Sequence, residues 1–114
     1  MDSTFWKKNI IEAIEDIADE DFQRTAWFGL SDKVSSPEEV YAILLYDFIF
    51  EDFLKLKENG LTESQKEACY KLIDALDAYP SHSSSLPSPE LMIDDPEWEA
   101  VRVVARRCLE ELRG

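Results

Sequence analysis

The sequence has little of the residue types on which metal sites and phosphate-binding loops depend. Its 114 residues include one histidine, two cysteines and three glycines. The histidine, His82, lies in a segment rich in serine and proline, and the cysteines form no Cys-x-x-Cys pair. A zinc site needs several Cys or His ligands at fixed spacing, and a phosphate loop needs clustered glycines. We therefore expect no metal, no cofactor and no catalytic residue, and we expect His82 to be a loop residue.

Secretion and membrane signals are also missing. The N-terminus lacks a basic segment followed by an apolar one, and no apolar run approaches the length of a transmembrane helix. Cys69 and Cys108 each lie among apolar residues in a helical pattern, which is typical of thiols in a reduced core. These observations predict a cytoplasmic protein with no membrane contact.

Basic residues are scarce. The chain has 12 of them against 25 acidic residues, which gives a net charge of −13. The excess lies in residues 1–95, since the stretch 96–114 holds as many bases as acids. Such a field repels nucleic acid and anionic membranes and attracts basic proteins. We therefore expect a basic protein partner and no direct binding to nucleic acid, although acidity that serves only solubility gives the same composition.

Apolar residues make up 45% of the chain, enough for the core of one domain spanning 1–114. Strand signals are weak, and apolar residues recur at spacings of three and four. We expect an all-α bundle of four to five helices, with an irregular Ser/Pro-rich excursion over residues 80–95 before the last helix. The predicted helices cover about 4–19, 21–28, 37–58, 62–78 and 96–112.

The predicted 37–58 helix is the most apolar of these. Ser36 followed by Pro37 and Glu39 is a strong start signal, and Asn59-Gly60 is a natural end. A helix that is apolar on most sides is normally central in its domain. Its expected inward face comprises Ala42, Leu45, Tyr46, Ile49, Phe50, Phe53 and Leu56.

Two groups of carboxylates are candidate partner-binding surfaces. The first, the N-terminal acidic strip, lies opposite the apolar face of the first helix and continues beyond it. Its members are Glu12, Glu15, Asp16, Asp19 and Glu20. The strip is open to two other interpretations. In the first, it is a plain solvated face. In the second, it is neutralised within the molecule by Arg102, Arg106 and Arg113 on the last helix.

The second group, the central acidic stripe, consists of Asp47, Glu51 and Asp52. A helical wheel places them opposite the apolar face, beside residues that we expect to be exposed: Val40, Leu44 and Leu54. Carboxylates among exposed apolar groups are typical of a protein interface. In the alternative, another helix covers these apolar residues, and Glu51 pairs only with Lys55.

In size, acidity and helix content, and in its arrangement from Thr62 to Arg107, the chain resembles immunity proteins that bacteria make against nuclease toxins. That arrangement is a capped helix, an irregular stretch with prolines and a helix started by proline. The similarity extends to the colicin-nuclease type and to immunity proteins of contact-dependent inhibition systems. The double-tyrosine-proline motif of the colicin type is absent, Tyr79-Pro80 being the nearest sequence, and no residue role is transferred.

The resemblance implies an acidic inhibitor that neutralises a basic toxin domain by direct binding, and not an enzyme. A regulatory adaptor that docks through apolar anchors, or a nucleic-acid mimic, is the alternative. An enzyme with an unfamiliar carboxylate site is a third class, and it requires perturbed acids in a deep pocket.

Overall fold

The structure, a computed structural model, describes residues 3–30, 32, 35–47, 49–56, 60–79 and 86–113, without the side chains of residues 3, 4 and 47. Within these residues every regular element is a helix and no strand occurs. The elements are α1 (Ser3–Ala18), α2 (Glu20–Ala26), α3 (Pro37–Ala42), the π-helical turn η1 (Ile43–Asp47), α4 (Phe50–Lys55), α5 (Glu63–Ala78), α6 (Pro89–Met92) and α7 (Pro96–Arg113). The predicted all-α fold is confirmed.

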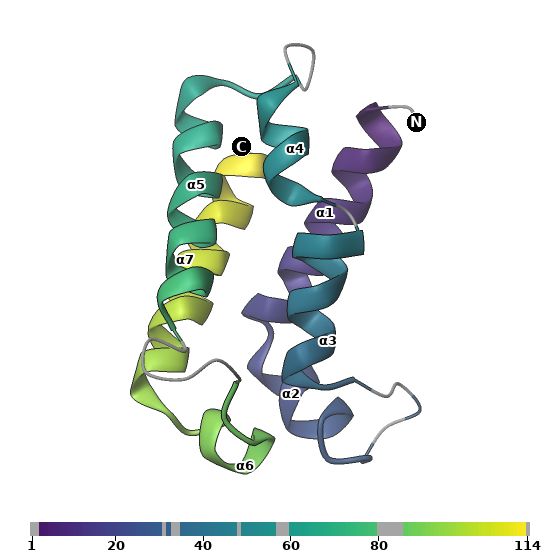
Figure 1. Cartoon of the computed structure of the whole chain (residues 1–114), viewed down its shortest axis with the longest axis vertical. Coiled ribbons are helices and arrows are strands. Elements are labelled where there is room, and N and C mark those ends of the chain that lie inside the picture. Colours follow the sequence, from purple (N-terminus) through teal and green to yellow (C-terminus); the bar gives the residue numbers. More distant parts are fainter. Residues whose placement is uncertain are drawn as a thin grey trace.

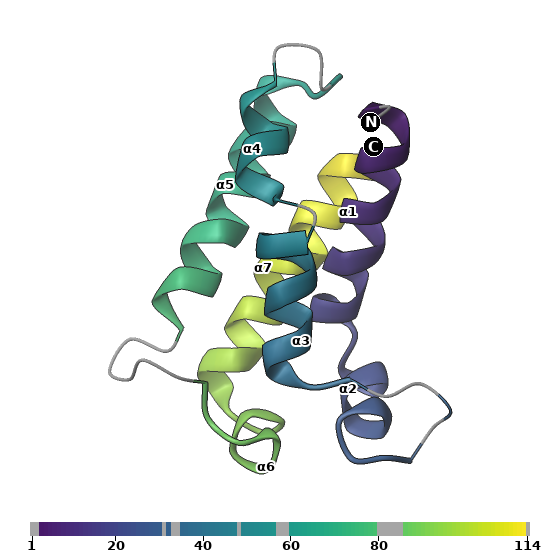
Figure 2. The same ribbon diagram turned by 45° about the vertical axis from the view of Figure 1, so that its right-hand side comes forward.

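Helix α7 is the centre of the bundle. It packs against α5 along one side and against α1 along another, and these are the two most extensive helix contacts. Figures 1 and 2 show α5 and α7 side by side, with α3 and α4 next to α1. Trp98, Ala105 and Cys108 of α7 are fully buried. The expectation that the 37–58 helix is central is therefore wrong, because its shorter pieces cover the outside of the α1–α7–α5 layer.

Local signals fixed the helix starts as predicted. The Ser36 hydroxyl accepts a hydrogen bond from the Glu39 backbone N–H at 3.1 Å. Thr62 and Gln65 form a capping box, in which the Thr62 hydroxyl accepts from Gln65 N–H at 3.1 Å and the Gln65 side chain accepts from Thr62 N–H at 2.8 Å. Each cap satisfies backbone donors that have no partner inside the helix.

The predicted continuous helix over 37–58 is wrong. The chain leaves α3 through the π-helical turn η1, and α4 begins after Ile49, whose φ of 48° lies in the left-handed region. A π-helical turn is wider than an α-helical one, and a left-handed residue redirects the chain. Both features shift the helical phase, so one wheel does not describe 37–58.

The phase shift also reverses the expected exposure of the apolar residues on this segment. Leu44 and Leu54 are buried with Val40, whereas Tyr46 is 75% exposed and Ile49 is 44% exposed. Phe50 and Phe53, which the wheel placed inward, are buried. The prediction that Val40, Leu44 and Leu54 face solvent is therefore wrong, and the alternative, that other helices cover them, is confirmed.

The 80–95 excursion is more regular than predicted in its described part. Residues 89–92 form α6, and Met92 and Ile93 are buried against the body. Leu91 points outward and is 70% exposed. Residues 80–85, which include His82, lie outside the described residues.

Candidate protein-binding surface

A buried polar cluster joins α1, α2 and α7 beneath the N-terminal acidic strip. The Gln23 side chain is fully buried and donates to the carbonyl oxygens of Asp16 and Ile17 at 3.0 and 2.8 Å. Its amide oxygen accepts from Trp98 Nε1 at 3.0 Å and from Arg102 Nε at 2.8 Å. Buried polar groups need such partners to offset lost hydration. The cluster therefore holds three helices in one arrangement.

Arg102 is a buried cation with partners for each nitrogen of its guanidinium group. It is 2% exposed, and it also donates to the Ile93 carbonyl at 3.0 Å and to Glu99 at 3.1 Å. Burial works against ionisation of Glu99, but hydrogen bonds from Arg102 and Arg106 outweigh it and lower the pKa of this carboxyl. Glu20 lies 3.8 Å from the same guanidinium. The charge of Arg102 is thus balanced inside the fold.

The N-terminal acidic strip is largely matched by cations and backbone groups of the same molecule. Glu15 pairs with Arg113 at 3.1 Å, and Glu20 pairs with Arg24 at 2.7 Å as well as approaching Arg102. Asp19 caps α2 by accepting from the Phe22 N–H at 3.0 Å. Internal neutralisation by Arg102 and Arg113 is therefore confirmed, while Arg106 pairs with Glu99 instead.

The other two members of the strip differ in exposure. Asp16 is partly buried. Glu12 is exposed in a shallow groove that also holds Lys7, Lys8 and Arg113, so cations surround it. The strip as a whole has a nearly balanced local charge.

The structure changes the setting of the central acidic stripe. Glu51 forms an ion pair with Lys55 at 3.1 Å, as one interpretation of the sequence expected. Asp52 is exposed on the same short helix. Asp47 ends η1, and its side chain lies outside the described residues. Since the expected apolar neighbours are buried, this stripe has no apolar anchors of the predicted kind.

The outer face of α5 carries an acidic row that the sequence interpretation missed. The residues recur at spacings of four and three, which places them within an arc of about 80°. All are exposed, and the row is directed away from the buried Cys69 and Leu72. Its members are Glu63, Glu67, Tyr70, Asp74 and Asp77. The sequence indicates this row through the helical periodicity of its carboxylates around one tyrosine.

Two lysines of α5 partly match this row. Lys66 lies 3.7 Å from Glu63, and Lys71 lies 3.4 Å from Glu67. Neither Asp74 nor Asp77 has an ion pair within the described part of the chain. The second half of the row therefore presents uncompensated carboxylates.

The central stripe and the α5 row lie on adjacent helices, because α4 packs against α5, and we treat the two as one candidate surface. The hydrogen bond from Lys55 to Glu51 raises the lysine pKa, and the fields of Asp52 and of Tyr70 on α5 add to this effect. Tyr70 thus lies within electrostatic reach of α4. We call this surface the α4–α5 acidic face and define it by Glu51, Asp52, Glu63, Glu67, Tyr70, Asp74 and Asp77.

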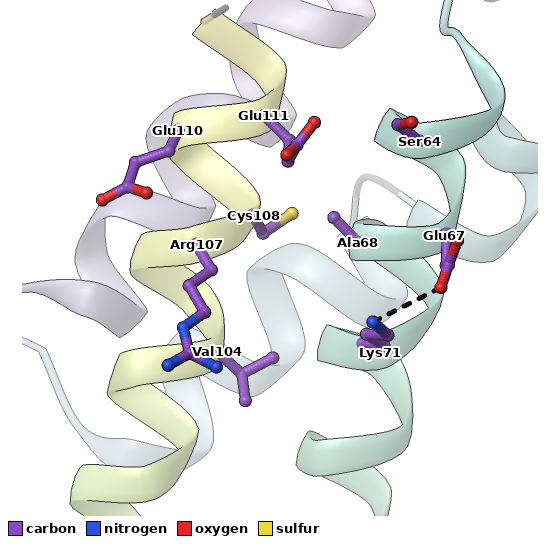
Figure 3. Close-up of a pocket in the computed structure, with 9 residues that line it drawn as sticks. All are labelled: Ser64, Glu67, Ala68, Lys71, Val104, Arg107, Cys108, Glu110 and Glu111. Carbon is purple, nitrogen blue, oxygen red and sulfur yellow. Dashed lines mark ion pairs between the residues drawn. The ribbon is translucent and has the colours of Figure 1, made fainter.

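A groove of about 480 Å³ runs between α5 and α7 (Figure 3). Both signs of charge line it, with Lys71 and Arg107 opposed by Glu67, Glu110 and Glu111. The described residues contain no group of three or more His, Cys, Asp or Glu side chains arranged to hold a metal ion. The groove is open, and its lining is mixed in charge.

No family model, no curated protein and no solved structure matches the chain. Among the described residues, none of the helices has the length and apolar character needed to span a bilayer.

Proposed function

We propose that this chain is a cytoplasmic, acidic, protein-binding inhibitor: an immunity protein that neutralises a basic, nuclease-type toxin domain by direct contact. The α4–α5 acidic face is the proposed contact surface. The observation that carries the proposal is the row of exposed carboxylates around Tyr70 on α5, of which Asp74 and Asp77 form no ion pair within the described residues.

The chemistry of this face suits a basic protein. Tyr70 is 39% exposed and offers a ring with a polar tip, the kind of side chain that often anchors an interface. Carboxylates around such an anchor select a cationic partner and fix its orientation. The net charge of −13 accelerates the first encounter with that partner.

The two surfaces predicted from the sequence take different roles in this proposal. Glu51 and Asp52 lie on the contact face, next to the position of Asp47 in the chain. The N-terminal acidic strip lies outside the contact face, because most of its charges are matched inside the fold, and its exposed members act only from a distance. Exposed charges of that kind mainly change the association rate, and salt screens them over about 8–10 Å.

A regulatory adaptor is the second candidate, and one observation favours it. Tyr46 and Ile49, at the junction of η1 and α4, are 75% and 44% exposed and offer apolar anchors beside the acids. An adaptor that docks through these groups binds a groove with little dependence on salt. Salt dependence therefore separates the two candidates.

The experiment measures binding to the protein encoded beside this gene in its genome, and the ability of the chain to restore growth of cells that produce that protein. The test variant is Asp74→Lys with Asp77→Lys. The matched control is Glu12→Lys with Glu15→Lys, which changes the net charge equally. Circular dichroism checks that both variants keep the helical fold.

We expect the α5 variant to lose affinity by about 10- to 100-fold, because two like charges then meet the partner's cations at the contact. The control should chiefly slow association at low salt. An equal loss of affinity in both variants would show that binding depends on net charge alone. The α4–α5 acidic face would then not be the contact surface. Binding that is independent of salt favours the adaptor, and failure to restore growth rejects the immunity function.

A further inference from the structure

The two cysteines of the chain meet in the core. Cys69 on α5 and Cys108 on α7 are both free and both fully buried, and their sulfur atoms lie 3.6 Å apart although 39 positions separate them in the sequence. Hydrophobic residues surround the pair on both helices. The Cys108 thiol donates a hydrogen bond to the Cys69 sulfur across this distance, and a disulfide requires the two sulfur atoms to approach to about 2.05 Å.

One of the two thiols borders the groove between α5 and α7. Cys108 is among the residues that line this groove, whereas Cys69 is not. Figure 3 shows the Cys108 sulfur pointing from α7 toward α5, close to Ala68, with Lys71 and Arg107 also lining the groove. A small reactant that enters the groove therefore reaches Cys108 before Cys69.

We propose that Cys69 and Cys108 form a dithiol oxidation site whose co-substrate is a low-molecular-weight disulfide of the glutathione-disulfide class. The Cys108 sulfur, after losing its proton, attacks one sulfur of that disulfide and releases one small thiol. The Cys69 sulfur, also deprotonated, then attacks Cys108 Sγ and releases the second small thiol. One disulfide and two protein thiols become one protein disulfide and two small thiols, so electrons and protons balance.

The local environment sets the rate of this reaction. The Cys108 thiol donates a hydrogen bond to Cys69 Sγ, and that bond together with burial raises the pKa of Cys108. Thiolate is the attacking form, so the pair stays reduced under ordinary thiol-rich conditions and oxidises slowly. The site is a slow sensor of sustained oxidation rather than a rapid exchange catalyst.

The cross-link joins α5 and α7, the helix pair with the most extensive contact. It closes a long chain segment, which restricts the unfolded state more than the folded one. The inference is based on the thiol contact and on the groove beside it, so it does not depend on the proposed function.

The test incubates the full chain with oxidised glutathione, quenches the thiols, and measures intact mass, free thiols under denaturing conditions and melting temperature. We expect the parent chain to lose two hydrogen atoms in mass and both free thiols, without dimerisation. Its melting temperature should rise by roughly 5–15 °C, and dithiothreitol should reverse the change.

Single variants then identify the order of attack. Cys69→Ala should accumulate a mixed disulfide with one glutathione on Cys108, while Cys108→Ala should leave Cys69 unmodified for much longer. Two retained thiols in the parent, a stable mixed disulfide in the parent, or a chain-to-chain cross-link would each overturn the proposal. The parent measurements decide the matter even where a variant does not fold.

Discussion

The N-terminal acidic strip and the α4–α5 acidic face look alike in sequence and differ in the structure. Glu15 of the strip pairs with Arg113 at 3.1 Å, and Glu20 lies 3.8 Å from Arg102, both arginines being on α7. On the α5 row, Glu63 and Glu67 form ion pairs with lysines of the same helix, and Asp74 and Asp77 form none within the described residues. The first surface is bonded across the fold, and the second is paired only locally.

The difference teaches that a run of acids is not by itself a binding surface. What decides is the source of the matching cations. Arginines of α7 pair with the strip and make it part of the bundle, whereas the ion pairs of the α5 row are with lysines of α5 itself. Ion pairs within one helix contribute only about 0.2–0.5 kcal/mol each, so a partner's cations displace them readily.

The first prediction tests whether the strip belongs to the fold, and it has the largest expected effect. Arg102→Ala should destabilise the chain by about 3–5 kcal/mol, because it leaves the Gln23 amide oxygen and the Ile93 carbonyl short of a buried donor. Arg102→Lys should recover little, since a lysine cannot reproduce the guanidinium fork. Urea unfolding measures both.

The control for Arg102 is Arg106→Ala. Arg106 also bonds Glu99, but its side chain is 44% exposed, and exposed ion pairs typically contribute less than about 1 kcal/mol. Similar losses in the two alanine variants would mean that the buried cluster is not what secures the strip.

The second prediction concerns the core beneath α4. Phe53→Ala should also cost about 3–5 kcal/mol, because the ring is 1% exposed and packs edge-on against Trp6 with ring centres 5.3 Å apart. Tyr46→Ala on the same segment should change the free energy of unfolding by less than about 0.5 kcal/mol, since that ring is 75% exposed. The sequence predicted that both rings face inward. An equal loss of stability in the two variants would therefore support the continuous helix over 37–58.

The sequence predicted the features that depend on near neighbours. Apolar spacing found α1, α5 and α7, and the caps at Ser36 and Thr62 lie where local hydrogen-bonding groups require them. Each signal is contained in a window of a few residues. The helices were therefore predictable although no relative of the chain guides the interpretation.

Features that depend on contacts between distant residues were not predictable. Gln23 bonds Trp98 and Arg102 from 75 and 79 positions away, and the Cys69–Cys108 contact spans 39. The break near Ile49 has no glycine or proline to mark it. The acidic row on α5 was visible as a periodicity, but only the neighbouring helices distinguish it from the N-terminal strip.

The third prediction compares the interrupted segment with a continuous helix. Ile49→Gly should stabilise the chain by about 0.5–1 kcal/mol, because glycine adopts a φ of 48° without the steric cost that a β-branched residue bears. The matched substitution Ile11→Gly in α1 should destabilise by about 1 kcal/mol or more, since glycine weakens a helix interior. Thermal unfolding of the two variants measures the sign of each change in stability. A loss of stability in both variants would show that Ile49 is not strained.

The last and smallest effect concerns Glu99, which joins two arginines of the buried side. Its pKa is lowered in the folded state, since hydrogen bonds from Arg102 and Arg106 exceed the opposing effect of burial. A carboxyl with a depressed folded pKa stabilises the fold above its unfolded pKa, and this contribution is lost as pH falls through the folded value.

Glu99→Gln should therefore be less stable than the parent at pH 7, by no more than about 1 kcal/mol for a pair this exposed. The difference should shrink as pH falls through the ordinary range of a carboxyl towards the lowered pKa of Glu99. Arg106→Ala, which removes one of the two donors, should weaken this pH dependence without abolishing it, because Arg102 remains. Urea unfolding of the parent and both variants between neutral and acidic pH measures these differences, and parallel curves for parent and Glu99→Gln would show that Glu99 is not coupled to the arginines.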